Sequence, residues 1–138
     1  MQHLEHQHQA ALIAWSLRVP LAKVSDIKPG SSVGHYLLAI PNGGKRSSAR
    51  EGARLKAEGV KPGVSDLLLP LRRGGFAGLW LELKAPGKRP NPNQREWIER
   101  MNAAGYFATW CDDWQHAVDV INSYLAGKPR HINRDAAP

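Results

Sequence analysis

The sequence contains a single cysteine, Cys111, and this scarcity excludes two classes of small protein. One thiol cannot form an intrachain disulfide, and it cannot supply a four-cysteine zinc site. The chain of 138 residues must therefore be stabilised by its own apolar core, and it is long enough to form one as a single domain. The low cysteine content favours a reducing, cytoplasmic compartment.

Long apolar runs are also missing. No segment approaches the roughly 20 apolar residues that span a bilayer. The first ten residues, MQHLEHQHQA, are polar, whereas a secretory signal would be basic and then apolar. The sequence therefore predicts a soluble protein with no membrane partner.

Acidic residues are few relative to basic ones. Twelve Asp and Glu stand against nineteen Lys and Arg, which gives a formal net charge of +7. A positive field of this kind concentrates polyanions, because cations that contact phosphates release bound counterions. Charge alone does not separate a nucleic-acid-binding protein from other basic proteins, so the positions of the cations matter.

Hydrophobic periodicity and turn residues predict the order helix, strand, helix, strand, strand, helix, strand, helix. The predicted helices cover about residues 4–18, 48–58, 92–104 and 113–125, and the predicted strands cover about 35–40, 66–71, 78–85 and 106–111. The predicted N-caps are Ser47 or Ser48, Asn91 or Asn93, and Asp112 or Asp113. Pro70 indicates that its strand ends there or lies near an edge. This order predicts an α/β sandwich with a small mixed β-sheet flanked by helices.

The segments DLLLPL and GLWLELKA flank RRGGFA and predict a β-hairpin. In an alternating strand, Glu82 and Lys84 share one face, and three leucines take the other. The simplest interpretation is a solvated face that carries an ordinary charge pair. If the hairpin turns at Gly74 and Gly75, an even register places Asp66 on the face of Glu82 and Lys84. An odd register places it on the opposite face.

An even register would create a possible metal site. Asp66 would then lie about 5 to 8 Å from Glu82, directly or diagonally across the hairpin. Oxygen ligands lie roughly 2 Å from Mg²⁺, so the two carboxylates could share one ion. Such an ion, beside the ammonium of Lys84, suits phosphodiester hydrolysis. The ion lowers the pKa of an attacking water, and the lysine orients that water or stabilises the developing charge.

The motif GVSD followed by ELK resembles the Asp…Glu-x-Lys signature of the PD-(D/E)XK nuclease superfamily. Around it, the segments AIPNGGKR, LKAEGVKPGVSDLLLP, GLWLELKAPG and NQREWIERMNAAGY together resemble the VRR-NUC (virus-type replication-repair nuclease) family over about residues 3–125. The resemblance implies a restriction-endonuclease-like three-layer sandwich, with a nuclease domain over 1–126 and a polar tail over 127–138. One departure is Ser65, where the family usually has proline.

The resemblance also implies roles for individual residues. Asp66 and Glu82 match the family's metal-binding carboxylates, with Mg²⁺ or Mn²⁺ as the cofactor, and Lys84 matches the catalytic lysine. Glu5 matches the glutamate of the first helix, and Gln94 matches a glutamine that often lines such sites. The predicted catalytic residues are Asp66, Glu82, Lys84, Gln94 and Glu5. The predicted metal ligands are Asp66, Glu82, Glu5 and the backbone carbonyl of Leu83.

The implied activity is that of a DNA endonuclease that acts on branched or structured DNA in replication, recombination or repair and leaves a 5′-phosphate. The resemblance further implies a homodimer in the cytoplasm of a bacterium or of a phage-infected host cell. Two alternatives stay open. One is a non-catalytic nucleic-acid-binding or assembly module that retains the fold, and the other is a Holliday-junction resolvase, which differs in substrate.

Basic residues that could contact phosphates occur on the second predicted helix and after the strand that contains Glu82. A solvated helix face is the alternative for the first group, because acidic residues at helical spacing partly neutralise it. The predicted DNA-contacting residues are Lys45, Arg46, Arg50, Arg54, Lys61, Lys88 and Arg89.

Several other features have simpler interpretations. His3, His6 and His8 do not share one helical face, so a solvated helix is favoured over a metal site. Trp80 lies on the face of Glu82 and is predicted either to cover the site or to pack under the first helix. Cys111 is predicted to be a buried apolar residue. The tryptophans assigned to the core are Trp15, Trp97 and Trp114.

Overall fold

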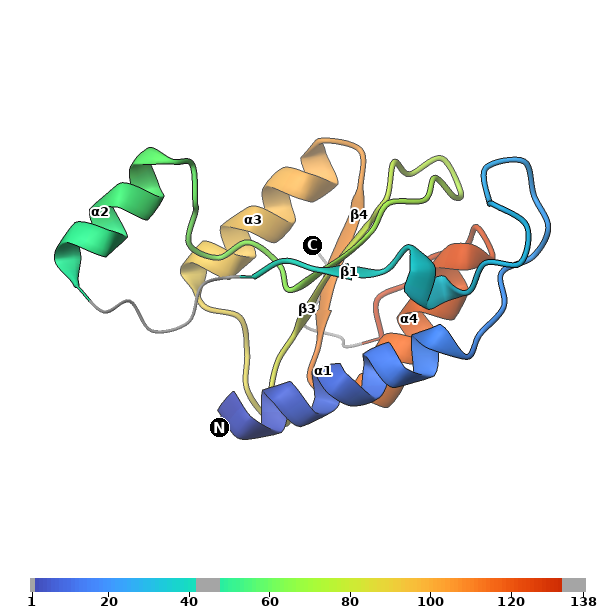
Figure 1. Ribbon diagram of the computed structural model, residues 1–138, viewed down its shortest axis with the longest axis horizontal. Helices are drawn as coiled ribbons and strands as arrows, with labels where there is room; N and C mark the ends of the chain where they lie inside the picture. Colours follow the sequence, from blue (N-terminus) through green and yellow to red (C-terminus); the bar gives the residue numbers. More distant parts are fainter. Residues whose placement is uncertain (1, 42–47, 133–138) are drawn as a thin grey trace.

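A four-stranded mixed sheet lies at the centre of the computed structural model, which describes residues 2–41 and 48–132 (Figure 1). The strands, in spatial order, are β1 (Leu38–Ala39), β2 (Leu67–Leu69), β3 (Leu79–Leu83) and β4 (Phe107–Cys111). The β1–β2 and β2–β3 pairs are antiparallel, and the β3–β4 pair is parallel. The helices are α1 (Gln2–Leu17), the 3₁₀ helix η1 (Val33–His35), α2 (Ala49–Ala57), α3 (Pro92–Ala103) and α4 (Trp114–Leu125).

Helices cover both faces of this sheet. On one face, the leucines of β3, represented by Leu81, form a core with Leu12 of α1 and Ile121 of α4. On the other face, Trp80 packs against a smaller cluster that includes Ile98 of α3. The alternation of side chains along β3 therefore separates two apolar layers, and the predicted α/β sandwich is confirmed.

The β2–β3 hairpin has an even register. Its paired residues are Leu67 with Leu81, Leu68 with Trp80, and Leu69 with Leu79. Continued by one residue beyond β2, the same register places Asp66 directly opposite Glu82. Because side chains alternate along a strand, Asp66, Glu82 and Lys84 then belong to one face.

The even register depends on one extra residue in the hairpin. At the turn, Arg73 and Phe76 exchange both backbone hydrogen bonds, at 3.2 and 2.8 Å, around Gly74 and Gly75. Both glycines have positive φ, +57° and +86°, as a type I′ turn requires. Between the turn and the strands, three residues (70–72) stand opposite only two (77–78). The pairing in the strands is therefore offset by one residue from the pairing at the turn. Pro70 begins the longer arm, and β2 ends before it, as predicted.

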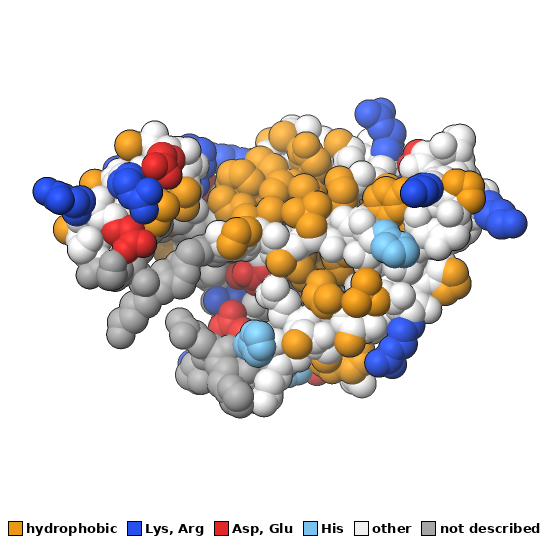
Figure 2. All heavy atoms as spheres, viewed as in Figure 1, with side chains coloured by type: hydrophobic (Ala, Val, Ile, Leu, Met, Phe, Trp, Pro, Cys, Tyr) orange, Lys and Arg blue, Asp and Glu red, His pale blue; other side chains and the backbone are white. Residues whose placement is uncertain are grey.

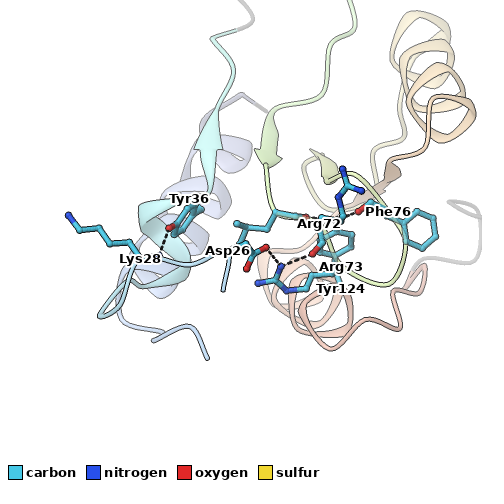
Figure 3. Close-up of polar contacts among 8 residues, drawn as sticks. Asp26, Lys28, Tyr36, Arg72, Arg73, Phe76 and Tyr124 are labelled. Atoms are coloured by element: carbon cyan, nitrogen blue, oxygen red, sulfur yellow. Dashed lines mark hydrogen bonds and ion pairs between the residues drawn. The ribbon is translucent and has the colours of Figure 1, made fainter. Parts of the chain in front are cut away.

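Side chains from three segments hold the turn end of the hairpin (Figure 3). The hydroxyl of Tyr124, a buried residue of α4, donates to the carbonyl oxygen of Leu71 at 2.6 Å and lies 3.4 Å from that of Phe76. The guanidinium of Arg73 lies 2.6 Å from a carboxylate oxygen of Asp26. These contacts connect both hairpin arms to the rest of the fold beside the extra residue. They therefore stabilise the register that fixes the position of Asp66.

Replacing Tyr124 with phenylalanine is expected to lower the free energy of unfolding by about 1–3 kcal/mol. The substitution removes the buried donor to the Leu71 carbonyl and adds no volume. The matched control is Tyr36→Phe, because the Tyr36 hydroxyl accepts an exposed bond from the Lys28 N–H at 3.0 Å. That control is expected to change stability by no more than about 0.5 kcal/mol. Urea denaturation of both variants measures the difference, and equal losses would contradict the role assigned to Tyr124.

The predicted helix ends are confirmed at three N-caps. The side chains of Ser48, Asn91 and Asp113 each accept a hydrogen bond from a backbone N–H in the first turn that follows. Pro92 occupies the start of α3, where its missing N–H costs nothing. In the described part of the chain, no helix combines the length and the apolar composition that a membrane span requires.

The predicted strand over 35–40 is largely wrong. Only Leu38–Ala39 forms β1, and His35, the first residue of the predicted strand, ends η1. The backbone N–H of Ser32 donates to Nδ1 of His35 at 2.8 Å, and this local bond favours a helical turn over an extended strand. The tail also contains packed residues that its polar composition did not indicate. Nδ1 of His131 lies 2.8 Å from the Thr109 hydroxyl of β4.

Candidate active site

Two carboxylates meet where β2 begins and β3 ends. Asp66 precedes β2, and one of its oxygens accepts a hydrogen bond from the backbone N–H of Leu83 at 2.9 Å. This bond ties the Asp66 side chain to β3, next to Glu82. The Asp66 side chain also forms a hydrogen bond with the side chain of Glu82, so the structure places the two carboxyl groups together, as the even register predicted.

Glu82 lies in the interior of the protein. Its exposed fraction is 2%, so the solvated strand face considered as the simplest interpretation is wrong. Within the described ranges 2–41 and 48–132, its Oε1 has no hydrogen-bond partner. Burial raises the pKa of Glu82 to about 9, and the negative charge of Asp66 adds to the rise, while Lys84 opposes it. Without a cation the carboxyl group of Glu82 is therefore protonated at neutral pH.

Lys84 is positioned by the helix that follows β3. Its backbone N–H donates to the Cys111 carbonyl at 2.7 Å, which continues the β3–β4 ladder. Its ammonium nitrogen lies 3.4 Å from Oε1 of Gln94. The same Oε1 accepts the Asn91 N–H at 2.8 Å, in a capping box that fixes the first turn of α3. Gln94 thus connects the start of α3 to the lysine.

Glu5 approaches the same group from α1. Figure 1 shows the first turns of α1 near the end of β3 and the chain that leads into α3. The negative charge of Glu5 is the weakest of the causes that raise the pKa of Glu82. In Figure 2, acidic and basic side chains meet in a recess between the start of α1 and the sheet. The structure therefore brings all five predicted catalytic residues into one region.

The residues present fit a hard divalent cation. The unpartnered Oε1 of Glu82 and the carboxylate of Asp66 are the oxygen donors that Mg²⁺ and Mn²⁺ prefer, and a cation there would keep Glu82 ionised. Among the described residues, no group of three or more His, Cys, Asp or Glu side chains converges closely enough to hold a metal. Ligation by Glu5 and by the carbonyl of Leu83 therefore stays a prediction.

Comparison with known proteins identifies the family. The model of the VRR-NUC domain matches residues 5–114 of this chain. The chain belongs to the VRR-NUC domain family. Among solved structures, it is similar to a VRR_NUC domain protein with a TM-score of 0.74 and 27% sequence identity, over 93% of this chain and 92% of that one. A search of curated proteins finds no significant match. The resemblance carried by the GVSD and ELK segments is thus confirmed, and the chain is a member of a nuclease family.

The VRR-NUC motif departs from its usual pattern at Ser65, and the structure shows the consequence. Ser65 is completely buried, and its hydroxyl has no hydrogen-bond partner among the residues that the structure describes. The serine therefore adds a cost of desolvation that a proline would not. It removes no candidate ligand, because Asp66 keeps its bond to the Leu83 N–H.

Two of the three histidines of α1, His6 and His8, have described side chains. His6 is exposed, and the side chain of His3 lies outside the described residues. Nδ1 of His8 accepts the backbone N–H of Trp114 at 3.1 Å. His8 thus satisfies one of the free N–H groups at the start of α4. A polar N-terminal sequence gives no signal for this contact, because the two partners are joined only by the fold.

The tryptophans are arranged differently from the predictions. Trp80 packs against α3 and not under α1. Its ring makes an edge contact with Trp97 of α3 at 5.4 Å between centroids, and another with Tyr106 at 6.2 Å. Trp15 and Trp114 are partly buried against the main core, as predicted. Trp97 is only half-buried and lines a cleft that the sequence did not indicate.

Cys111 is buried, and burial raises the pKa of its thiol to about 12, so it is not a nucleophile at neutral pH.

The predicted DNA-contacting residues are spread over two exposed segments. Arg50 and Arg54 are exposed on α2, and Lys88 and Arg89 are exposed in the turn after β3. Lys61 follows α2 and is also exposed, whereas Lys45 and Arg46 lie outside the described residues.

Proposed function

We propose that this VRR-NUC protein is a divalent-metal-dependent DNA endonuclease. The observation that carries the proposal is the buried carboxyl group of Glu82, opposite Asp66 and beside Lys84. A buried carboxyl group with an unpartnered oxygen costs stability, and a purely structural site would gain nothing from a second carboxylate next to it. A cation binding to this pair removes that cost and supplies a charge for catalysis.

In the proposed mechanism, Asp66 and Glu82 would hold Mg²⁺ or Mn²⁺, with Glu5 and the Leu83 carbonyl as further donors. When bound, the ion would supply Lewis acidity, lowering the pKa of water and neutralising charge on the phosphoryl oxygens. Lys84 would hold the attacking water in line with the scissile bond or donate to the developing charge. Gln94 would restrict the ammonium of Lys84 to a narrow range of positions.

Charge supports DNA as the substrate. The chain carries a net charge of +7 although its active site is acidic, so the cations must lie elsewhere on the surface. Lys88 and Arg89 lie in the exposed loop between β3 and α3 and could contact the strand that is cut. Helix α2, with Arg50 and Arg54, has no buried residue and stands apart from the sheet (Figure 1). We propose that α2 extends the contact along branched or structured DNA.

Self-association as a homodimer is part of the proposal. Figure 2 shows a broad apolar area on one face of the molecule. Leu38 of the two-residue edge strand β1 is 41% exposed. Apolar surface of this kind is often covered by a partner chain.

The test is a cleavage assay with Mg²⁺, with Mn²⁺ and with EDTA on flaps, four-way junctions and plain duplexes. We expect metal-dependent cleavage that leaves a 5′-phosphate, with Lys84→Ala slower by about a hundredfold. Salt-dependent binding with no cleavage under any condition would instead support the non-catalytic module. Cleavage confined to four-way junctions, at symmetrical positions, would support the resolvase.

A further inference from the structure

A cleft of about 320 Å³ lies between α3 and the loop that follows α2. No candidate catalytic residue lines it, so it is separate from the recess of Glu82. The volume is in the range of small ligand sites. The lining residues are Lys56, Val60, Lys61, Pro62, Asn93, Glu96, Trp97 and Arg100.

The cleft carries positive charge that the protein does not neutralise. Arg100 is engaged by Glu96, whose carboxylate lies 2.7 Å from the guanidinium. Lys56 and Lys61 are exposed, and within the described ranges neither forms an ion pair. Two ammonium groups therefore remain for an anionic ligand. Phosphate is such a ligand. The other lining residues, Trp97 above all, indicate which kind of phosphate compound fits.

Trp97 supplies a fixed aromatic surface in the same cleft. Its ring is held by the edge contact with Trp80, with an interplanar angle of 84°. It is half-buried and lines the cleft. An indole beside two lysines combines base stacking with backbone neutralisation, which is how proteins hold unpaired nucleotides. A base-paired nucleotide cannot offer the same face, because its base is stacked inside the duplex.

The cleft adjoins the catalytic residues through both of its walls. On one wall, Asn93 immediately precedes Gln94, which contacts Lys84. The other wall is the loop that leads through Gly63 to Asp66. These walls touch, because a Cβ added at Gly63 would lie 2.5 Å from the carbonyl carbon and oxygen of Asn93. Along the chain, the cleft therefore lies within a few residues of Asp66 on one wall and of Gln94 on the other.

We propose that this cleft binds one unpaired nucleotide of the substrate, next to the scissile phosphate, with its base on Trp97 and its phosphate between Lys56 and Lys61. The inference rests on the proposed nuclease function and adds to it a requirement for unpaired DNA beside the cut. It assigns the preference for structured DNA to the cleft between α3 and the loop that follows α2.

The test measures binding in EDTA, so that cleavage does not enter. The double variant Lys56→Gln/Lys61→Gln is compared with Lys23→Gln/Lys28→Gln, which removes the same charge from exposed positions in the segment between α1 and η1. We expect the cleft variant to lose about tenfold or more in affinity for a duplex that carries an unpaired nucleotide, relative to the control. For a plain duplex, the two variants should lose affinity equally.

A fluorescent base gives a second readout. 2-Aminopurine placed at the unpaired position should be quenched by stacking on wild-type protein and on Trp97→Phe, but not on Trp97→Leu. Thermal unfolding of the Trp97 variants checks that each is folded. Equal losses for both lysine variants on both DNAs, or quenching that persists in Trp97→Leu, would overturn the assignment. If the protein binds DNA with an unpaired nucleotide selectively but never cleaves it, the nuclease proposal is wrong and the assignment of the cleft is retained.

Discussion

Replacing Glu82 with glutamine is expected to reduce metal-dependent cleavage by at least about a hundredfold, and at the same time to stabilise the metal-free protein at neutral and alkaline pH. The first effect follows from the loss of a carboxylate ligand. The second follows from burial, because glutamine carries no charge to desolvate and has a similar volume. A loss of activity that accompanies a gain in stability separates a functional residue from a structural one.

The raised pKa of Glu82 determines whether the wild type gains or loses stability as pH rises. The pKa of Glu82 is about 9 in the folded protein, compared with an ordinary value of 4.5. Between these two values the unfolded chain is ionised while the folded chain holds the proton, so the folded state binds more protons. The metal-free wild type should therefore lose stability relative to Glu82→Gln as pH rises from 4.5 towards 9, by up to about 1.4 kcal/mol per pH unit.

Urea denaturation in EDTA at several pH values between 5 and 8.5 measures this slope. The control is Glu58→Gln at the C-cap of α2, which removes an exposed carboxylate and should leave the wild-type slope unchanged. Mg²⁺ or Mn²⁺ should then raise the stability of the wild type most at high pH, because binding must displace one proton, and should have little effect on Glu82→Gln. Identical pH profiles for the wild type and Glu82→Gln would contradict the burial of a titrating carboxyl group.

The sequence was sufficient to predict the fold class. It also predicted that Asp66, Glu82 and Lys84 share one face, on the condition that the hairpin register is even. Alternation along β3 placed Glu82 and Lys84 together, and the glycine pair located the turn. Neither observation determined whether the hairpin register is even or odd, and therefore on which face Asp66 lies. The structure resolves it through the arm that begins at Pro70, where one extra residue returns the strands to an even register. A proline that merely ends a strand and a proline that accompanies an insertion look the same in a single sequence.

Other features depended on contacts between distant segments. The burial of Glu82 could not be read from LWLELKA, because a charge pair at alternate positions is typical of a solvated face. Burial arises from the neighbouring strands and from α3 packing on that side. The cleft at Trp97 was missed for the same reason, since helical spacing assigns a tryptophan to a core without saying how much of its ring the partner covers.

Gly63 is the position where a single methyl group is expected to do the most damage to the site outside the catalytic residues themselves. Its φ is +85°, and an added Cβ would lie 2.5 Å from backbone atoms of Asn93. Because the obstacle is backbone, no change of rotamer relieves it. Either the loop before Asp66 or the first turn of α3 must move, and these two segments hold Asp66 and Gln94.

Gly59→Ala is the matched control for Gly63→Ala. Gly59 also has a positive φ, +95°, but a Cβ there meets nothing within 4 Å. Both variants pay about 1–2 kcal/mol for a left-handed alanine. Only Gly63→Ala should lose more than that in urea denaturation, and only it should lower the cleavage rate, by about a hundredfold if the metal-binding and lysine-holding segments separate by about 1 Å. Equal effects at the two glycines would mean that the contact between the loop and α3 does not position the catalytic residues.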